Sequence, residues 1–297
     1  MTLQDILAQA TQRLEAAPLA YGHGTHNARD EAAWLVLWRL GLPLDSDLDA
    51  LATQTLSEAQ VQAIDALIAQ RIETRKPAAY LTNEAWLQGV PFYIDERSIV
   101  PRSFIAELIA DGGFDSWLSE DTRQVLDLCT GNGSLAVLAA MAWPDVAVVG
   151  ADLSQDALAV ARINVDRHGL QDRIRLIESD NLQNCPGPYD LILCNPPYVN
   201  ASSMGALPAE YRAEPEMALA GGEDGMDFVR QLLLDAPSRL SPDGILILEI
   251  GNERAFFKAA FPHLEALWLS TSAGEDQVLL LTADALSAHL PPCAPAP

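Results

Sequence analysis

The chain is poor in positive charge. Its 297 residues contain 18 Lys and Arg against 41 Asp and Glu, a formal net charge of −23. Proteins that grip nucleic acid use Lys and Arg to displace phosphate counterions, so this composition argues against direct, sequence-specific nucleic-acid binding. It suits a basic protein partner, because opposite fields steer two molecules together. The plainer interpretation, that acidity only aids solubility, explains the charge about as well.

Long hydrophobic runs are also missing. No apolar run reaches the roughly 18 residues of a membrane span. The amphipathic N-terminus, MTLQDILAQA, lacks the apolar region of a signal peptide. We therefore expect no contact with membranes.

Cysteines are few: Cys129, Cys185, Cys194 and Cys293. Their spacing matches neither a zinc ribbon nor a C-x-x-C redox pair, so we expect no metal site. Two of them lie in apolar runs typical of buried strands. This indicates reduced core thiols and a cytoplasmic protein.

Hydrophobic residues make up 49% of the chain, enough for a sizeable core. Over residues 1–76 they recur at helical spacing, with residues 53–72 as the longest stretch. This predicts a small helical domain without a catalytic constellation, and recognition of the substrate is the role that we expect for it. Residues 77–101 change character, and alternation around the turn at Gly89 predicts a β-hairpin that links this domain to the rest.

Strand-like and helix-like segments alternate over residues 102–286. The predicted strands are 124–129, 146–152, 173–178, 189–194 and 244–249, the predicted helices are 134–141, 156–168 and 228–240, and the pair 266–271 and 277–282 closes the domain as a hairpin. This order predicts a seven-stranded, Rossmann-like, doubly wound α/β sheet. The terminal hairpin suits a methyltransferase better than a dehydrogenase. Residues 287–297, which are rich in proline from Pro291, are expected to form a mobile tail.

A glycine-containing turn follows the first predicted strand. Glycines there let the backbone approach a ligand closely, and the following helix presents free N–H groups. The spacing is not G-x-G-x-x-G, which argues against a dinucleotide, and an ordinary tight turn is the alternative. The candidate cofactor residues in this turn are Asp127, Cys129, Thr130, Gly131, Asn132 and Gly133.

An acid ends the second predicted strand. Asp152 stands where acids hydrogen-bond ribose hydroxyls in such folds; the alternative is a helix N-cap, for which Ser154 is better placed. Together with the glycine turn it indicates a nucleoside ligand, and the missing dinucleotide fingerprint favours S-adenosylmethionine. Asp180 and Asn181 follow the third strand, where they would lie near the adenine or form a plain turn.

The tetrapeptide Asn195-Pro196-Pro197-Tyr198 follows the fourth predicted strand. Two prolines fix the backbone, and the carbonyls and the Asn195 side chain supply acceptors that would hold both hydrogens of an –NH2 group. Tyr198 would stack on a flat amide or ring. We interpret Asn195, Pro196 and Tyr198 as catalytic, all four residues as substrate-binding, and Asn195 as also touching the cofactor. The alternative is a double-proline turn that merely leaves a strand.

These motifs together resemble the HemK/PrmC/PrmB group of glutamine N(5)-methyltransferases, over nearly the whole chain. The resemblance implies that residues 129–133 and Asp152 bind S-adenosylmethionine and that residues 195–198 hold the substrate glutamine. Two positions depart from the pattern: Cys129 replaces a glycine, and Asn181 replaces an aromatic residue that similar proteins often have.

Within the group, the chain is most similar to the PrmB branch, whose members methylate a glutamine of the large-subunit ribosomal protein L-three. The stretch Tyr21-Gly-His-Gly-Thr25 and residues 207–216 carry this choice, and Ser103-Phe104 argues against the release-factor branch. A basic ribosomal protein is thus the implied partner. Release-factor methylation, an adenine or cytosine amino methyltransferase, and a non-enzymatic ribosome-assembly binder are the alternatives.

Four further residues have open roles. Glu214 and Glu216 would either meet a basic substrate segment or be solvated loop charges. His23 and His26 are expected to be loop-packing or surface residues rather than catalysts.

Overall fold

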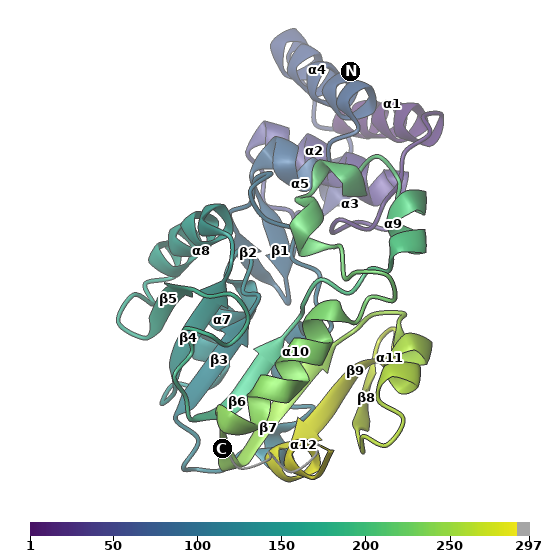
Figure 1. Ribbon diagram of the computed structural model, residues 1–297. Helices are drawn as coiled ribbons and strands as arrows, with labels where there is room; N and C mark the ends of the chain where they lie inside the picture. The colour runs from purple at the N-terminus through teal and green to yellow at the C-terminus, as the bar shows by residue number, and fades with distance from the viewer. Residues whose placement is uncertain (290–297) are drawn as a thin grey trace.

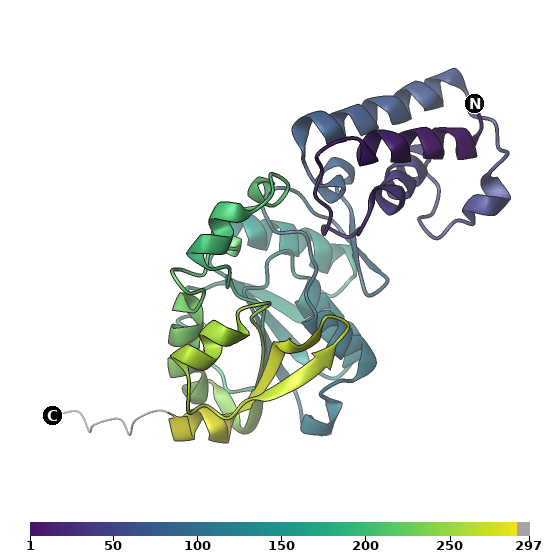
Figure 2. The same ribbon diagram turned by 90° about the vertical axis from the view of Figure 1, so that its right-hand side faces the viewer.

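A computed structural model describes residues 1–289 of the chain. A helical N-terminal domain stands at one end of the molecule, and a sheet flanked by helices forms the other (Figures 1 and 2). No helix within the described range is long and apolar enough to cross a membrane.

Five helices build the N-terminal domain: α1 (Leu3–Glu15), α2 (Ala28–Leu40), α3 (Leu48–Leu51), α4 (Glu58–Thr74) and α5 (Ala78–Thr82). Ile6, Leu35 and Ile68 are fully buried where these helices meet. The helix predicted from residue 53 begins only at Glu58, because Ser57 caps it with a reciprocal hydrogen bond to Gln60. The preceding residues are held extended instead, by the N–H of Leu3 on the carbonyl of Gln54.

The predicted hairpin consists of β1 (Ala85–Leu87) and β2 (Val90–Phe92), which pair in antiparallel fashion. Gln88 and Gly89 both have positive φ at its turn, as a tight two-residue hairpin loop requires. Beyond β2, the N–H of Tyr93 donates to Asn164 Oδ1 at 2.7 Å, and Asn164 Nδ2 donates back to the Tyr93 carbonyl. The hairpin is therefore fastened to the sheet domain.

The main sheet has the order β5-β4-β3-β6-β7-β9-β8, in which the first five strands are parallel and β9 pairs in antiparallel fashion with both β7 and β8. The strands are β3 (Gln124–Leu128), β4 (Ala147–Asp152), β5 (Ile174–Glu178), β6 (Tyr189–Cys194), β7 (Leu240–Glu249), β8 (Leu267–Thr271) and β9 (Gly274–Thr282). This confirms the predicted seven-stranded α/β sheet with its terminal hairpin. The chain leaves β3 towards one edge and returns to β6 on its other side, so a crevice opens at the carboxyl ends of these strands.

Helices cover both faces of the sheet. One core contains α6 (Ile105–Asp111), α7 (Ser134–Ala142) and α8 (Gln155–Arg167); the other contains α10 (Asp227–Asp235), α11 (Arg254–Ala260) and α12 (Ala283–His289). The helix predicted over 228–240 ends early because Pro237 lies in a 3-10 turn after Asp235, and β7 begins at Leu240.

The C-terminal end differs in part from the expectation. Residues 287–289, placed in a mobile tail, complete α12, and residues 290–297 lie outside the described range. A second difference is the long segment 199–226 between β6 and α10, which carries the short helix α9 (Ala201–Ala206) and extends to the helical domain (Figure 1).

Candidate active site

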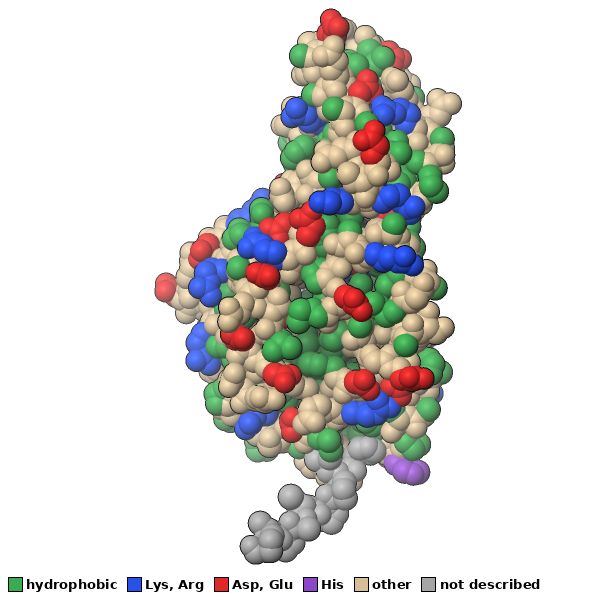
Figure 3. Space-filling view, turned by 45° about the horizontal axis from the view of Figure 1, so that its top comes forward, with side chains coloured by type: hydrophobic (Ala, Val, Ile, Leu, Met, Phe, Trp, Pro, Cys, Tyr) green, Lys and Arg blue, Asp and Glu red, His purple; other side chains and the backbone are tan. Residues whose placement is uncertain are grey.

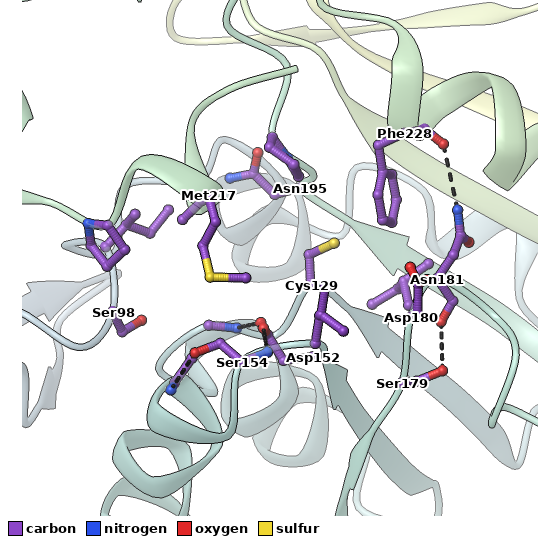
Figure 4. Close-up of a pocket in the computed structure, with 18 of the residues that line it drawn as sticks. Ser98, Cys129, Asp152, Ser154, Ser179, Asp180, Asn181, Asn195, Met217 and Phe228 are labelled. Atoms are coloured by element: carbon purple, nitrogen blue, oxygen red, sulfur yellow. Dashed lines mark hydrogen bonds between the residues drawn. The ribbon is translucent and has the colours of Figure 1, made fainter. Parts of the chain in front are cut away.

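A cavity opens at the carboxyl ends of β3, β4 and β6, as the topology requires. Cys129, Asp152, Asn181 and Asn195 lie around it at the ends of four different strands (Figure 4). Seen from above, the surface is hollowed at this face, hydrophobic side chains line the hollow, and charges of both signs surround it (Figure 3). Sequence positions spread over more than sixty residues thus meet at one place.

The glycine turn curls because three of its residues adopt positive φ. These are Cys129, Gly131 and Gly133. A side chain at Gly133 would come within 3.1 Å of Ala161 Cβ, so only glycine lets the start of α7 approach α8 this closely. Cys129 keeps its left-handed conformation without the freedom of glycine, and its side chain faces the cavity (Figure 4).

Asp127 braces the turn from behind and does not line the cavity. Its carboxylate accepts from Thr130 Oγ1 at 2.5 Å and from the N–H of Ala136 at 2.9 Å. Burial raises the pKa of Asp127 to about 7. Thr130 and Asn132 are likewise buried in supporting contacts. The structure thus separates the predicted cofactor residues into a lining group and a bracing group.

Asp152 ends β4 and faces the cavity. One carboxylate oxygen accepts from the N–H of Gly131 and the other from the N–H of Ser154, both at 2.9 Å. Burial raises its pKa, against these hydrogen bonds. Ser154, not Asp152, caps α8 by accepting from the N–H of Ala157. The Asp152 side chain is therefore not used up as a helix cap.

Asp180 and Asn181 line the end of the cavity that lies opposite Ser98. Asn181 Nδ2 donates to the carbonyl of Phe228 at 3.5 Å, and its buried Oδ1 has no protein partner. The ring of Phe228, from α10, forms this wall (Figure 4). The aromatic side chain that is absent at Asn181 is thus replaced in space by one 47 residues later.

Asn195 stands between two pockets. It and Pro197 line the first cavity, whereas Asn195, Pro196 and Tyr198 line a second pocket on the other side. The Tyr198 ring packs on Gly251, where an added Cβ would lie 2.6 Å from Cε2. The tetrapeptide is therefore a wall with one face towards each pocket, as a transfer between two bound molecules demands.

Glu214 neither faces a substrate segment nor is a solvated loop charge, so both interpretations of this residue were wrong. The side chain is buried, and its oxygens accept from Arg102 at 2.6 and 2.8 Å and from the N–H of Val100. Burial raises its pKa, but the charge of Arg102 and contacts with His23 overcome this and lower the pKa to about 2. It therefore anchors the 199–226 segment. Glu216 is exposed.

The two histidines are placed as expected. His23 is buried, 3.4 Å from Glu214 and with its ring tilted against that of Tyr211, and His26 is exposed.

Ser98, Met217 and Phe228 are among the cavity residues that the sequence analysis did not assign to the site. Ser98 follows the hairpin, and its buried Oγ has no protein partner. Met217 belongs to the 199–226 segment. No local pattern marks such residues, because they reach the cavity only through packing between distant parts of the chain.

Known proteins match the chain along its length. Residues 5–82 match the family model described as PrmC N-terminal domain, and residues 114–209 match Methyltransferase small domain. The ribosomal protein uL3 glutamine methyltransferase of Bordetella pertussis is 52% identical over 289 residues, 96% of this chain and 96% of that protein. The protein of the same description from Burkholderia pseudomallei is 51% identical, over 97% of this chain and 96% of its own. The chain belongs to the uL3 glutamine methyltransferase family.

Members of the uL3 glutamine methyltransferase family use S-adenosylmethionine, and the cavity fits this molecule. Ser98 Oγ and Asn181 Oδ1 are buried polar atoms without protein partners, at opposite sides of the cavity. Asp152 adds an acceptor for hydroxyl groups and Phe228 a flat apolar surface. These polar and apolar groups therefore match a ligand with a polar amino-acid end, a ribose and a flat base.

Proposed function

We propose that this protein methylates the side-chain amide nitrogen of a glutamine in ribosomal protein uL3. The observation that carries the proposal is the position of Asn195, which lines the cofactor cavity and the second pocket at once. The match to uL3 enzymes over nearly the full chain supports the choice of substrate.

The cofactor would lie along the strand ends. Asp152 would accept the ribose hydroxyls, and Asp180, Asn181 and Phe228 would surround the adenine. The backbone of residues 129–133 and the Ser98 hydroxyl would hold the amino-acid end. When bound, S-adenosylmethionine supplies an electrophilic methyl group on a sulfonium.

The amide nitrogen is a poor nucleophile because its lone pair is delocalised. The carbonyls of Asn195 and Pro196 and the Asn195 side chain would accept its two hydrogens, draw density onto nitrogen and align it with the methyl group. Such alignment contributes up to about 7–11 kcal/mol to lowering a barrier. Tyr198 would pack on the flat amide.

The acidic composition supports a basic protein rather than a nucleic acid as the substrate. The free, buried thiols of Cys185 and Cys194 support a cytoplasmic location. Release-factor methylation is the second candidate, since it needs the same pocket chemistry. Both proteins carry glutamines, so a side-by-side assay decides between them.

The test is transfer of labelled methyl from S-adenosylmethionine to purified uL3 and to a release factor. Label on a uL3 glutamine, located by mass spectrometry, is expected, and label on the release factor alone would redirect the proposal. Asn195→Ala should reduce transfer at least about 100-fold while cofactor binding largely survives. Asn184→Ala is the matched control, because Asn184 is exposed outside the cavity.

A further inference from the structure

One buried carboxylate has no part in the function described so far. Glu249 ends β7, is 2% exposed, and comes two residues before Gly251, which lines the second pocket. Its Oε2 accepts from Ser103 Oγ at 2.6 Å and from the N–H groups of Phe104 and Ile105. Among residues 1–289 it makes no ion pair with a Lys, Arg or His. Burying a carboxylate that accepts hydrogen bonds only from uncharged donors costs free energy of folding. A functional role would explain why this residue is a glutamate.

Glu249 is linked to the pocket through Tyr198. The Tyr198 hydroxyl lies close enough to the Glu249 carboxylate for this carboxylate to raise the pKa of Tyr198, after burial the largest cause. The Tyr198 ring rests on Gly251, two residues further along the chain from Glu249. Tyr198 itself lines the second pocket beside Asn195 and Pro196. A continuous path therefore runs from the pocket through one hydroxyl to one carboxylate.

Of the described ionisable groups around the second pocket, Glu249 is the one whose pKa lies near neutral pH. Arg102 lies close by, but its guanidinium is held by Glu214, whose own pKa is lowered to about 2. Tyr198 and the nearby Arg102 both have raised pKa values. Burial raises the pKa of Glu249 to about 7, against the hydrogen bonds from residues 103–105 and the charge of Arg102. A base works best when its pKa lies near the working pH.

We propose that Glu249 is the proton acceptor of the methyl transfer and that it is reached through the Tyr198 hydroxyl. The proposal rests on the glutamine methylation proposed above. As the N–C bond forms and the S–C bond breaks, one of the two amide N–H protons leaves its acceptor in the tetrapeptide and passes to the Tyr198 oxygen, and the Tyr198 proton passes to Glu249. The positive charge of the sulfonium and the negative charge of Glu249 disappear together, and Tyr198 ends unchanged. Glu249 does not touch the substrate, so it is a positioning residue that acts through Tyr198.

The experiment measures single-turnover methylation of uL3 between pH 5.5 and 9 with both substrates saturating. The wild-type rate should rise about tenfold per pH unit below pH 7 and then level off. Glu249→Gln keeps the shape of the side chain but removes the base. It should lower the rate at pH 8 by roughly 100-fold or more and abolish the rise, with the cofactor Kd changed less than about threefold.

Tyr198→Phe tests the relay without touching the buried carboxylate. It should lose the rise as well, and the double variant should be no slower than Glu249→Gln, because both residues serve one path. Should Glu249→Gln fail to fold, Tyr198→Phe still decides. Glu253→Gln is the matched control, a buried acid nearby that accepts from Asn200 and lines neither pocket. It should keep the rise, as should His23→Asn, which changes the imidazole beside Glu214.

Two results would overturn the inference: a rise retained in Glu249→Gln or Tyr198→Phe, or a flat wild-type profile. Titration of Asp127 is separated from that of Glu249 because it would change the cofactor Kd rather than the saturated rate. Absence of any methylated uL3 from the wild-type protein would instead refute the proposed function, so the two failures are distinguishable.

Discussion

At the scale of residues, Asp152 joins structure to binding. It holds the N–H of Gly131 and is proposed to hold the ribose as well. Asp152→Asn should weaken S-adenosylmethionine binding roughly 10- to 100-fold, because a hydrogen bond to a charged group contributes about 1.5–3 kcal/mol. Isothermal titration calorimetry would measure this. Asp156→Asn, on the exposed first turn of α8, should bind normally, and equal affinities for both variants would exclude the role.

Phe228 gives a second prediction at this scale. Its ring walls the end of the cavity where the adenine is proposed to bind. Stacking of an aromatic residue on a base contributes about 1–3 kcal/mol, so Phe228→Ala should weaken cofactor binding roughly 5- to 100-fold. Phe256→Ala, on the exposed side of α11, is the control. A similar affinity in both variants would place the adenine elsewhere.

At the scale of elements, Glu214 determines how firmly the 199–226 segment is held. Its lowered pKa means that it stabilises the fold above pH 4.5, and that this stability is lost as the pH falls towards 2. The shift from 4.5 to about 2 corresponds to roughly 3 kcal/mol. Urea unfolding should show Glu214→Gln less stable than wild type by about that amount at pH 7, with a gap that narrows below pH 5. A gap independent of pH would contradict the assignment.

The same scale shows what a single sequence predicts well. The strands and most helices followed from apolar periodicity, and the topology placed Cys129, Asp152 and Asn195 at one edge. Boundaries were weaker where caps decide them, as at Ser57, or where proline ends a helix, as at Pro237.

Several site residues were not predictable from the sequence. Ser98 and Phe228 lie outside the strand ends, and Glu249, although it ends β7, becomes a functional candidate only through contacts with distant residues such as Ser103. Glu214 was misjudged for the same reason, since a loop acid has no local sign that an arginine 112 positions earlier will bury it.

At the scale of the whole molecule, the charge of −23 should act on encounter with the substrate rather than on chemistry. Raising the salt concentration from 50 to 300 mM should increase the KM for uL3 several-fold and leave kcat nearly unchanged, because salt screens the long-range attraction. Steady-state kinetics with wild-type protein would show this. The KM for S-adenosylmethionine serves as the internal control, and an unchanged KM for uL3 would leave the acidity with a role in solubility alone.

The helical domain and the active-site segment share one buried ion-pair network. Glu210, from that segment, accepts from Arg75 at 2.7 and 2.6 Å and from Arg71, which also pairs with Glu31 of α2. Arg71 and Glu210 are buried, so removing one partner leaves an uncompensated charge. The pieces that wall the two pockets are therefore fixed to the domain proposed to recognise the substrate.

This network has a consequence for inheritance. If the helical domain were exchanged for that of a relative without matching arginines, Glu210 would be left as a buried charge without a partner. This would destabilise the protein even if each part folded well by itself. Recombination between lineages with different substrates is thus restricted to crossovers that carry residues 31, 71, 75 and 210 together. Recognition domain and active-site segment are expected to evolve as a single heritable unit, although more than a hundred residues separate them in the sequence.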